Sequence, residues 1–287
     1  MDLYKDIKEQ IKKRYSTLPK NQRKIAEYFI ENFDHIPFIT VQEASESTGS
    51  SGASIVRFAQ RVGFSGFSQL KDEIAKALKN RLTNKEFFPL FEKHSSEEDI
   101  LTEVANLDIK NINDTLNLIE RNKFNTVIDR IVKAEKVFTA GLGISYLLAE
   151  ILAYQLTQVG VNSTAFKHSY AIFLEQILFL KKSDLIIFFS FPPYSKETVE
   201  AAKFASERKI NVITITNNQT SPVTFYSKTN LIVKSENMLF TNSFAAISVL
   251  INAIATSCAL RDKQRAKKIL KESEKIMRSH NQLISGS

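Results

Sequence analysis

Residues 40–70 read TVQEASESTGSSGASIVRFAQRVGFSGFSQL, and the organisation of the N-terminal part of the chain follows from this stretch. Thr40 is a residue type that caps helices, because its hydroxyl accepts a hydrogen bond from a free backbone N–H. The spacing predicts a helix over Val41–Ser47. Gly49 is expected to end it, since glycine takes the left-handed conformation of a C-terminal cap without steric cost.

A second helix follows a short turn. Ser51 is its expected N-cap, and it is predicted to run from Gly52 to Val62 and to end at Gly63. One face has apolar residues at helical spacing and is predicted to be buried: Ile55, Phe58, Ala59 and Val62. The opposite face carries hydroxyl, amide and guanidinium groups: Ser51, Ser54, Arg57, Gln60 and Arg61.

Two short helices joined by a tight turn, the second with a polar outer face, are typical of a helix-turn-helix. Arg and Gln can pair with base edges in the major groove, and hydroxyls with phosphates. Lys71 lies one turn into a third helix, predicted to start near Gly66, and is expected to contact a phosphate. A small helical bundle with a solvated polar face fits the same pattern, so both interpretations stand at this point.

The wider segment Leu18–Leu82 resembles the N-terminal helix-turn-helix domain of the MurR/RpiR family of bacterial transcriptional regulators. The most specific match is VRF at 56–58 followed by GFSGFSQLK at 63–71. Family members usually carry Pro where this chain has Gly52. The resemblance implies sequence-specific binding of double-stranded DNA through the outer face of Ser51–Val62.

Composition agrees with a DNA-binding module on a second domain. The 287 residues suggest two domains, and the net charge of +8 is uneven. Residues 1–82 hold 14 basic against 10 acidic residues, residues 83–260 hold 17 against 18, and residues 261–287 hold 8 against 3. The single cysteine, Cys258, excludes an intramolecular disulfide and is expected in the core. No apolar run reaches transmembrane length and no signal peptide is apparent, so we expect a cytoplasmic protein without a membrane partner.

The predicted domains are a helix-turn-helix domain over 1–82, a linker over 83–95 and an α/β domain over 96–287. In the linker, Phe87, Phe88 and Phe91 are expected to dock on a domain or on a partner subunit. Ser96 and Asp99 suggest a helix cap. The helix after it is predicted to reach Glu120, with one face traced by Ile100, Val104, Leu107, Asn111 and Leu118, and a second helix to cover 124–134.

From Lys136 onward, short apolar runs alternate with helical patterns. This alternation indicates a doubly wound parallel sheet covered on both faces, so the fold class is α/β after an all-α domain. The predicted strands are KVFTA (136–140), NSTAFKH (162–168), DLIIFFS (184–190), INVITIT (210–216) and NLIVK (230–234). The predicted helices cover 146–159, 171–180, 197–208 and 241–259, with a basic helix after them to 279.

Ligands in such sheets bind beyond the carboxyl ends of the strands, and two strand-to-helix turns carry candidate groups there. The first turn contains Gly141, Gly143 and Ser145, where glycines admit a ligand and the helix N-terminus favours an anion. A dinucleotide fingerprint would need a third glycine at position 146, which is Tyr. An ordinary tight turn is the alternative.

The second turn, SFPPYSKET (190–198), follows the strand DLIIFF. Its hydroxyls and phenol suit a phosphate or a polyol, and the candidate ligand-binding residues are Ser190, Tyr194, Ser195 and Thr198. A proline-stiffened turn with Ser195 as the N-cap is the alternative. Together the two turns can converge on one crevice.

From Lys136 to Ala259 the chain is similar to the SIS domain, the sugar-isomerase-like module that binds phosphosugars and usually accompanies this helix-turn-helix. In SIS domains the second turn reads SxSGxTxET. This chain keeps Ser190, Lys196, Glu197 and Thr198 but carries Pro192-Pro193 in place of Ser-Gly, which removes one hydroxyl and two amide donors. The resemblance implies a phosphosugar effector, with N-acetylmannosamine 6-phosphate the first choice and glucosamine 6-phosphate the second.

His168 and Glu175 are the remaining candidates, expected at the same sheet edge, where they would bond sugar hydroxyls or act as base and acid. Three functions stay open: a transcription factor controlled by a phosphosugar, an aldose–ketose sugar-phosphate isomerase with an added helical domain, and an interaction module without ligand. The first is favoured, with no catalytic residues, metal or cofactor expected. A homodimer or higher homo-oligomer on an inverted-repeat operator is expected because one helix reads too few base pairs.

Overall fold

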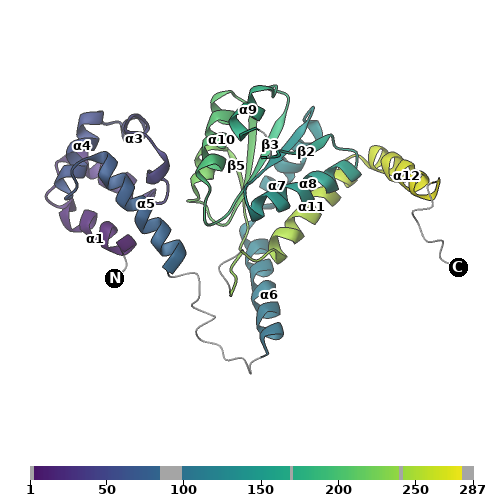
Figure 1. Cartoon of the computed structure of the whole chain (residues 1–287), viewed down its shortest axis with the longest axis horizontal. Coiled ribbons are helices and arrows are strands. Elements are labelled where there is room, and N and C mark those ends of the chain that lie inside the picture. The colour runs from purple at the N-terminus through teal and green to yellow at the C-terminus, as the bar shows by residue number, and fades with distance from the viewer. Residues whose placement is uncertain (1–2, 85–98, 169–170, 239–241, 280–287) are drawn as a thin grey trace. The chain divides into compact units, whose positions relative to one another are not determined.

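The computed structural model describes residues 3–84, 99–168, 171–238 and 242–279, and the chain divides near Ile100 into two compact units. The first unit is helical (Figure 1). Its elements are α1 (Leu3–Tyr15), α2 (Lys20–Glu31), the 3-10 helix η1 (Ile36–Phe38), α3 (Val41–Thr48), α4 (Gly52–Arg61) and α5 (Phe67–Asn84).

Local hydrogen bonds fix the ends of α3 and α4. The Glu43 backbone N–H donates to the Thr40 hydroxyl at 3.2 Å, while the Thr40 N–H donates to the Glu43 carboxylate at 2.8 Å, which makes a capping box. Gly49 closes α3 with φ 60°. The Ser51 hydroxyl caps α4 by accepting from the Ser54 N–H at 3.3 Å. Both helices therefore have the caps that the sequence predicts.

The apolar face of α4 lies in the core of this unit. Ile55, Phe58 and Ala59 are fully buried, and so is the C-capping Val62. The Phe58 ring meets the ring of Phe29 edge-on, with centroids 5.1 Å apart. Each buried aromatic of this kind contributes roughly 1.5–3 kcal/mol. The packing therefore orients α4 so that its polar side faces solvent.

The second unit is α/β. Within the described residues its strands form a five-stranded, all-parallel sheet in the order β2-β1-β3-β4-β5, which confirms the predicted class. Its elements in chain order are α6 (Ile100–Leu118), α7 (Arg121–Lys133), β1 (Val137–Ala140), α8 (Ile144–Gln158), β2 (Ser163–Ala165), α9 (Phe173–Leu178), β3 (Leu185–Ser190), α10 (Lys196–Glu207), β4 (Asn211–Thr216), η3 (Pro222–Tyr226), β5 (Thr229–Ile232), α11 (Ala245–Arg261) and α12 (Lys263–Ser279).

Helices cover both faces of the sheet, so a strand such as β3 is buried along its whole length. Leu185, Ile187 and Phe189 join the core formed with α7, α8 and α11. Ile186 and Phe188 join the core formed with α9 and α10. This alternation follows from the period of two along a strand. The strand order reverses between β1 and β3, which places the switch point of the fold there.

One predicted strand end needs correction. The strand predicted over 162–168 ends at Ala165, because β1 offers partners only as far as Ala140, so His168 lies in the loop beyond the strand. On α6, Ile100 and Leu118 at the two ends of the predicted face are exposed, while Asn111 in its middle is buried.

Polar side chains of α6 bond the segment that follows β5. The buried side chain of Asn111 bonds the backbone of Glu236 at both its N–H and its carbonyl, and the buried Thr115 hydroxyl accepts from the Lys234 N–H at 2.9 Å. These bonds fix which side of α6 faces the rest of the α/β unit.

Some predictions fall on residues that the structure does not describe. The docking of Phe87, Phe88 and Phe91 and the cap at Ser96 lie outside the described residues, as does the predicted linker beyond Asn84, where α5 ends.

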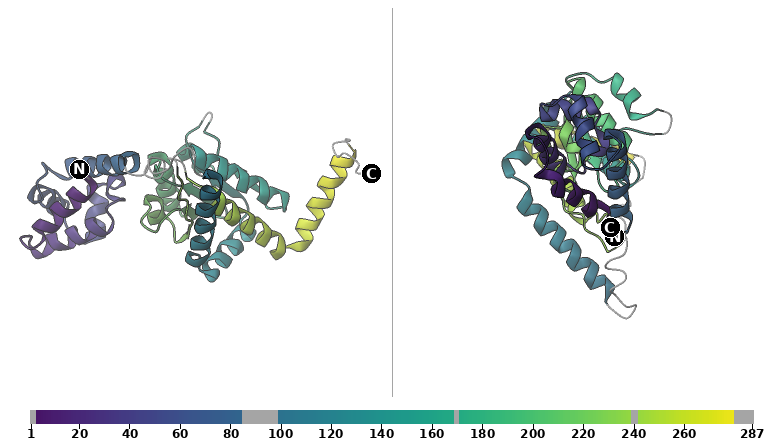
Figure 2. Two further views of the ribbon diagram at one scale, coloured as in Figure 1. Left: turned by 90° about the horizontal axis from the view of Figure 1, so that it is seen from below. Right: turned by 90° about the vertical axis from the view of Figure 1, so that its left-hand side faces the viewer.

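Cys258 is buried in α11, as predicted, and burial raises the pKa of its thiol to about 12. In the described part of the chain, no single helix has the length and apolar character to cross a membrane. Only α11 and α12 taken together meet that test, and they are bent by 107° at their junction. The left view of Figure 2 shows this bend from a further direction.

Candidate functional site

The outer face of α4 carries a chain of polar contacts. The Ser51 and Ser54 hydroxyl oxygens lie 3.0 Å apart, and the Arg57 guanidinium donates to the Ser54 hydroxyl at 3.5 Å. The bond from Arg57 is at the limit of hydrogen-bond length, and its side chain is exposed. Arg57 is therefore presented to solvent from the middle of α4 with little to hold it in place.

The two neighbouring candidates on α4 have local partners. The Gln60 amide donates to the Ser65 carbonyl at 3.4 Å. The Arg61 guanidinium donates to the side chain of Gln22, a buried residue of α2, at 3.3 Å. Arg61 thus ties α4 to α2 as well as facing solvent, whereas Gln60 and Arg57 contact only nearby groups.

Lys71 has a structural contact. Its ammonium group donates to the backbone carbonyl of Ile39 at 2.9 Å, which links α5 to the end of η1 just before the α3 cap. An ammonium has three donors, so this bond and a phosphate contact are chemically compatible.

The first ligand turn lies at the end of β1, beside the switch point. A Cβ added at Gly141 would come within 2.7 Å of the Ser145 backbone, so only glycine fits there. Gly143 has φ 59° and precedes α8 directly, which again requires glycine. Ser145 is buried in the first turn of α8. The three predicted residues therefore lie together where a helix begins.

The second turn contains two buried hydroxyls without partners. Ser190 ends β3 and Thr198 lies in the first turn of α10. Neither Ser190 Oγ nor Thr198 Oγ1 has a hydrogen-bond partner among the described residues, although both atoms are buried. Buried polar groups are nearly always hydrogen-bonded, so two such hydroxyls at one strand end call for a functional explanation. Ser195, by contrast, caps α10 by accepting from the Thr198 N–H at 3.4 Å.

Asparagines hold the proline segment of this turn. The Tyr194 hydroxyl donates to the Asn217 side chain at 2.7 Å and accepts from the Asn218 amide at 3.1 Å. The Asn242 amide donates to the Pro192 carbonyl at 2.7 Å, and the Pro192–Pro193 bond is cis. These asparagines were not among the predicted site residues. The Asn-Asn pair directly after β4 was the available signal, because it marks the same edge of the sheet.

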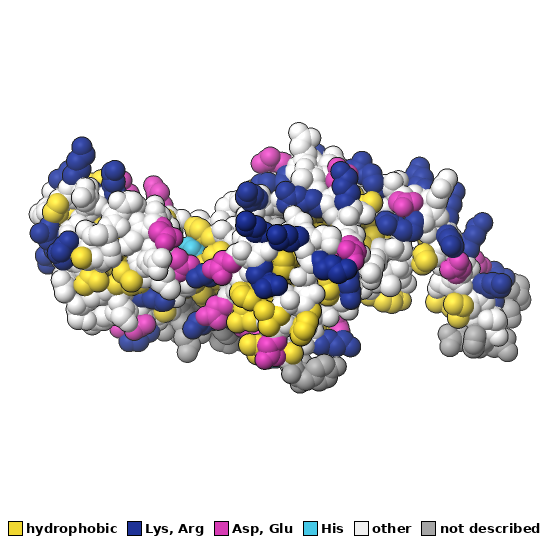
Figure 3. Space-filling view, turned by 90° about the horizontal axis from the view of Figure 1, so that it is seen from above, with side chains coloured by type: hydrophobic (Ala, Val, Ile, Leu, Met, Phe, Trp, Pro, Cys, Tyr) yellow, Lys and Arg dark blue, Asp and Glu magenta, His cyan; other side chains and the backbone are white. Residues whose placement is uncertain are grey.

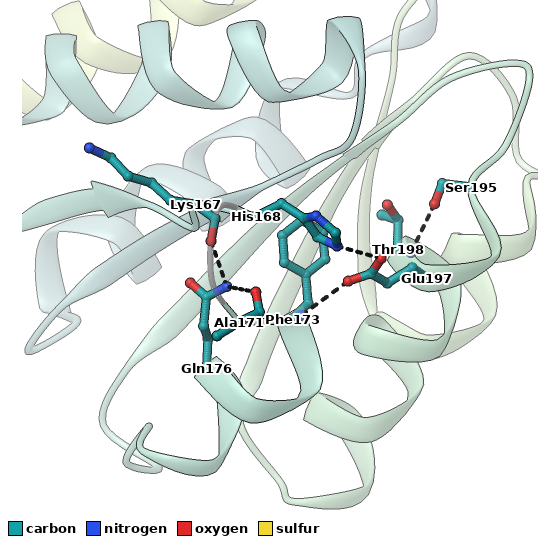
Figure 4. A network of polar contacts seen from close by, with 8 residues as sticks. All are labelled: Lys167, His168, Ala171, Phe173, Gln176, Ser195, Glu197 and Thr198. Carbon is teal, nitrogen blue, oxygen red and sulfur yellow. Dashed lines mark hydrogen bonds and ion pairs between the residues drawn. The ribbon is translucent and has the colours of Figure 1, made fainter.

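The imidazole of His168 lies against the carboxylate of Glu197, at the start of α10. Its Nε2 lies 2.9 Å from Glu197 Oε2, and the other carboxylate oxygen accepts from the Phe173 backbone N–H at 3.1 Å (Figure 4). Glu175 is exposed in the first turn of α9. The loop after β2 thus lays the imidazole against the start of α10, and the roles predicted for His168 and Glu175 toward a sugar stay predictions.

The His168–Glu197 pair is one part of a set of contacts around the loop after β2. The Gln176 amide donates to the carbonyls of Lys167 and Ala171, at 3.0 Å each, and so fastens that loop to α9 (Figure 4). Glu197 and Thr198 are consecutive residues in the first turn of α10, so the same turn supplies the carboxylate that holds His168 and one of the two unpartnered hydroxyls.

Within the described residues, side chains that bind metal ions do not cluster at this site. In the ranges that the structure describes, no three His, Cys, Asp or Glu side chains gather as a metal site would require.

Family models of known proteins match segments in each of the two units. The model of the helix-turn-helix domain of the rpiR family matches residues 5–81, and the model of the SIS domain matches residues 130–257. An uncharacterized HTH-type transcriptional regulator of Haemophilus influenzae is 26% identical over 228 residues, 77% of each chain. The uncharacterized HTH-type transcriptional regulator TTE0211 of Caldanaerobacter subterraneus is 27% identical over 238 residues, 82% of each chain.

Two solved structures share the fold. The sugar isomerase domain of an RpiR transcription factor from Sphaerobacter thermophilus has a TM-score of 0.60 and 24% identity, covering 62% of this chain and 99% of that one. The Vibrio vulnificus NanR protein, complexed with ManNAc-6P, has a TM-score of 0.62 and 22% identity, covering 98% and 100%. With a matching helix-turn-helix model before a matching SIS model, the chain belongs to the MurR/RpiR family.

Proposed function

We propose that this chain is a DNA-binding transcriptional regulator of sugar or amino-sugar catabolism genes, controlled by a phosphosugar. The helix-turn-helix domain over 1–82 reads DNA, the segment 83–95 links the domains, and the domain over 96–287 binds the effector and dimerises. Its relatives of similar length are named HTH-type transcriptional regulators, which supports the first part of this proposal.

DNA recognition rests on the outer face of α4, where Arg57 and Gln60 are exposed beside the Ser51 and Ser54 hydroxyls. Arg pairs with guanine and Gln with adenine, while hydroxyls and Lys71 suit phosphates. The basic side chains of the chain are interspersed with acidic ones (Figure 3), so charge alone does not select DNA. The shape and polarity of the α4 face carry this part of the proposal.

The main support for an effector site is the pair of buried, unpartnered hydroxyls of Ser190 and Thr198. They lie at the carboxyl edge of the sheet beside the switch point and at the N-terminus of α10, where backbone N–H groups and the helix dipole favour an anion. Gly141, Gly143 and Ser145 supply a second helix start on the neighbouring strand. N-acetylmannosamine 6-phosphate is the first candidate, since the similar NanR protein is complexed with ManNAc-6P, and glucosamine 6-phosphate is the second.

An isomerase is the second candidate function. The His168–Glu197 pair favours it, because an imidazole held by a carboxylate can move a proton. We infer that the chain is not an enzyme, because that carboxylate already accepts from the Phe173 N–H and the relatives are named as regulators. In this reading His168 contributes to holding the loop after β2, and ligand contact remains its proposed role.

The experiment combines calorimetric titration of the full chain with a DNA mobility shift, using both amino-sugar phosphates and a panel of hexose phosphates. Binding of one sugar phosphate that changes the affinity for DNA, with no turnover of that sugar phosphate, supports the regulator. Turnover of any member of the panel supports the isomerase. Wild-type protein that binds no sugar phosphate while still binding DNA would contradict the effector site.

A further inference from the structure

Gln22 is a polar residue in the core of the helical unit. It lies in the first turn of α2 and is only 5% exposed, whereas the other buried residues of that helix, Ile25, Ala26 and Phe29, are apolar. A long amide side chain is rarely buried to this extent without a partner, because an unbonded amide in the core is costly. The partner of Gln22 therefore bears on why this position is polar.

That partner is the guanidinium of Arg61, the last residue of α4. Its Nη1 donates to the side-chain oxygen of Gln22 at 3.3 Å. The Arg61 side chain is exposed, and a guanidinium has five N–H donors, so the bond to Gln22 leaves donors available to a ligand. A buried residue of α2 thus holds in place an exposed cation of α4.

The buried partner is neutral, and this matters for the charge of Arg61. A carboxylate at the position of Gln22 would bind the guanidinium more tightly but would cancel its charge. The amide restrains Arg61 and leaves it a full cation. The first turn of α2 carries no acidic residue that would cancel this charge in place of Gln22.

The helices around Arg61 together stay positive. Helix α4 has two basic and no acidic residues, α2 has three basic and two acidic residues, and α3 has two acidic residues, which gives net charges of +2, +1 and −2. The acidic residues of α3 have partners within reach of their own helix, since Glu43 accepts from Thr40 and Glu46 accepts from Gln42. An anionic ligand therefore suits the free side of the Arg61 guanidinium.

The place of Arg61 on α4 indicates which part of DNA it meets. Arg61 lies one turn after Arg57 on the same face of the helix. In a helix-turn-helix the N-terminal residues of the recognition helix contact base edges, so its last residue lies nearer the phosphates. Arg57 is held only by the 3.5 Å bond to Ser54 and can adjust to a base, whereas Arg61 is restrained, as a phosphate contact that sets orientation requires.

We propose that Gln22 is a positioning residue that holds Arg61 in place for a DNA phosphate. The inference rests on the proposed binding of DNA by α4, and it adds a residue of α2 that acts without touching DNA. A side chain that is restrained before binding loses less conformational freedom when it binds, so the bond to Gln22 strengthens the phosphate contact.

Binding of the full chain to a random-sequence duplex of about 30 base pairs tests this at low salt, because phosphate contacts do not depend on sequence. Arg61→Ala should weaken binding and reduce the salt slope by about 1, since one phosphate contact is lost. Gln22→Met should weaken binding about two- to tenfold with an unchanged slope, since the cation remains but is no longer restrained. Fluorescence anisotropy over a series of salt concentrations measures both quantities.

Folding of the Gln22→Met variant is checked separately. Methionine has a similar length and suits the buried site, and water replaces the lost acceptor because Arg61 is exposed. We therefore expect thermal unfolding close to that of the wild type, so that a loss of DNA affinity does not reflect a loss of folded protein.

A double variant and a matched control show whether Gln22 acts through Arg61. Gln22→Met made in the Arg61→Ala chain should cause no further loss of DNA affinity. Gln10→Met is the control, because Gln10 of α1 also bonds the end of α4, but to a backbone carbonyl, that of Val62, at 2.5 Å. This control should keep the wild-type affinity for the duplex.

The outcomes separate this inference from the proposed function. Wild-type affinity in Gln22→Met, the same loss with and without Arg61, or an equal loss in Gln10→Met would overturn the positioning role and leave DNA binding standing. A wild-type chain that does not bind the duplex at low salt contradicts the DNA-binding function and this inference with it.

Discussion

Arg57 is the single residue on which DNA specificity depends most in this proposal. Its guanidinium is exposed and held only by a 3.5 Å bond to Ser54, so it can turn toward a base at little cost. Arg57→Ala should therefore lower the affinity for the specific site by about 1–3 kcal/mol while leaving random DNA nearly unaffected. Fluorescence anisotropy with both DNAs measures the ratio of the two affinities. An unchanged ratio would mean that Arg57 does not contact a base.

Lys71→Ala is the matched comparison. It should weaken binding to all sequences alike and reduce the salt dependence by one phosphate contact, a slope change of about 1. Loss of the bond to the Ile39 carbonyl should also lower stability by about 1 kcal/mol. A variant that loses stability with an unaltered salt slope would show that Lys71 has only the structural contact.

Ser145 and Ser190 carry the prediction for the effector. Replacing either by Ala should remove a hydrogen bond to a charged phosphate and cost about 1.5–3 kcal/mol, roughly ten- to a hundredfold in ligand affinity. DNA binding without ligand should stay nearly unchanged, because both residues lie in the SIS domain. Calorimetric titration of each variant with the two amino-sugar phosphates is the measurement. Wild-type affinity in both variants would place the ligand elsewhere.

At the scale of elements, the turn between β1 and α8 leaves the least room for a larger side chain in the candidate site. Gly141→Ala would place a Cβ within 2.7 Å of backbone atoms of Ser145, and the backbone cannot yield as a flexible side chain can. We expect this variant to lose effector binding and about 1–3 kcal/mol of stability. Gly66→Ala, whose added Cβ meets only Val56 at 3.9 Å, is the control and should keep effector binding. Equal behaviour of the two variants in calorimetry and thermal unfolding would contradict this explanation.

The sequence predicts those elements best whose ends are set locally. The bounds of α3 and α4 follow from Thr40, Gly49 and Ser51, because caps act within one turn of the helix. The long-range contacts of α6 could not be predicted in this way. Its orientation depends on bonds from Asn111 and Thr115 to backbone groups more than a hundred residues later in the chain. The spacing of apolar residues along α6 gives no information about partners so far away in the sequence.

The same limit applies to the candidate site. Gly141, Gly143, Ser190 and Thr198 could be found because a parallel sheet brings its strand ends to one edge. The pairing of His168 with Glu197 could not be predicted, because it depends on the path of the loop after β2. That strand ends three residues earlier than the apolar pattern suggests.

At the scale of the whole molecule, the proposed regulator should bind as a homodimer to inverted repeats. Two recognition helices related by a two-fold axis would contact half-sites spaced by about 34–36 Å, or a multiple of it. Inserting about five base pairs between the half-sites should then abolish tight binding, because it rotates one half-site to the opposite side of the duplex. Mobility shifts on the spaced sites measure this. A chain that sediments as a monomer yet binds the operator tightly would contradict the model.

The two unpartnered hydroxyls also bear on how this protein would evolve. A buried hydroxyl without a bond costs the folded state about 1–3 kcal/mol, so replacing Ser190 or Thr198 by an apolar residue of similar shape should raise the melting temperature of the ligand-free protein. Selection for thermal stability alone would therefore remove the residues proposed to hold the effector. A regulator that keeps both hydroxyls sacrifices stability to retain its response, and a descendant that loses them would be more robust and insensitive to the sugar.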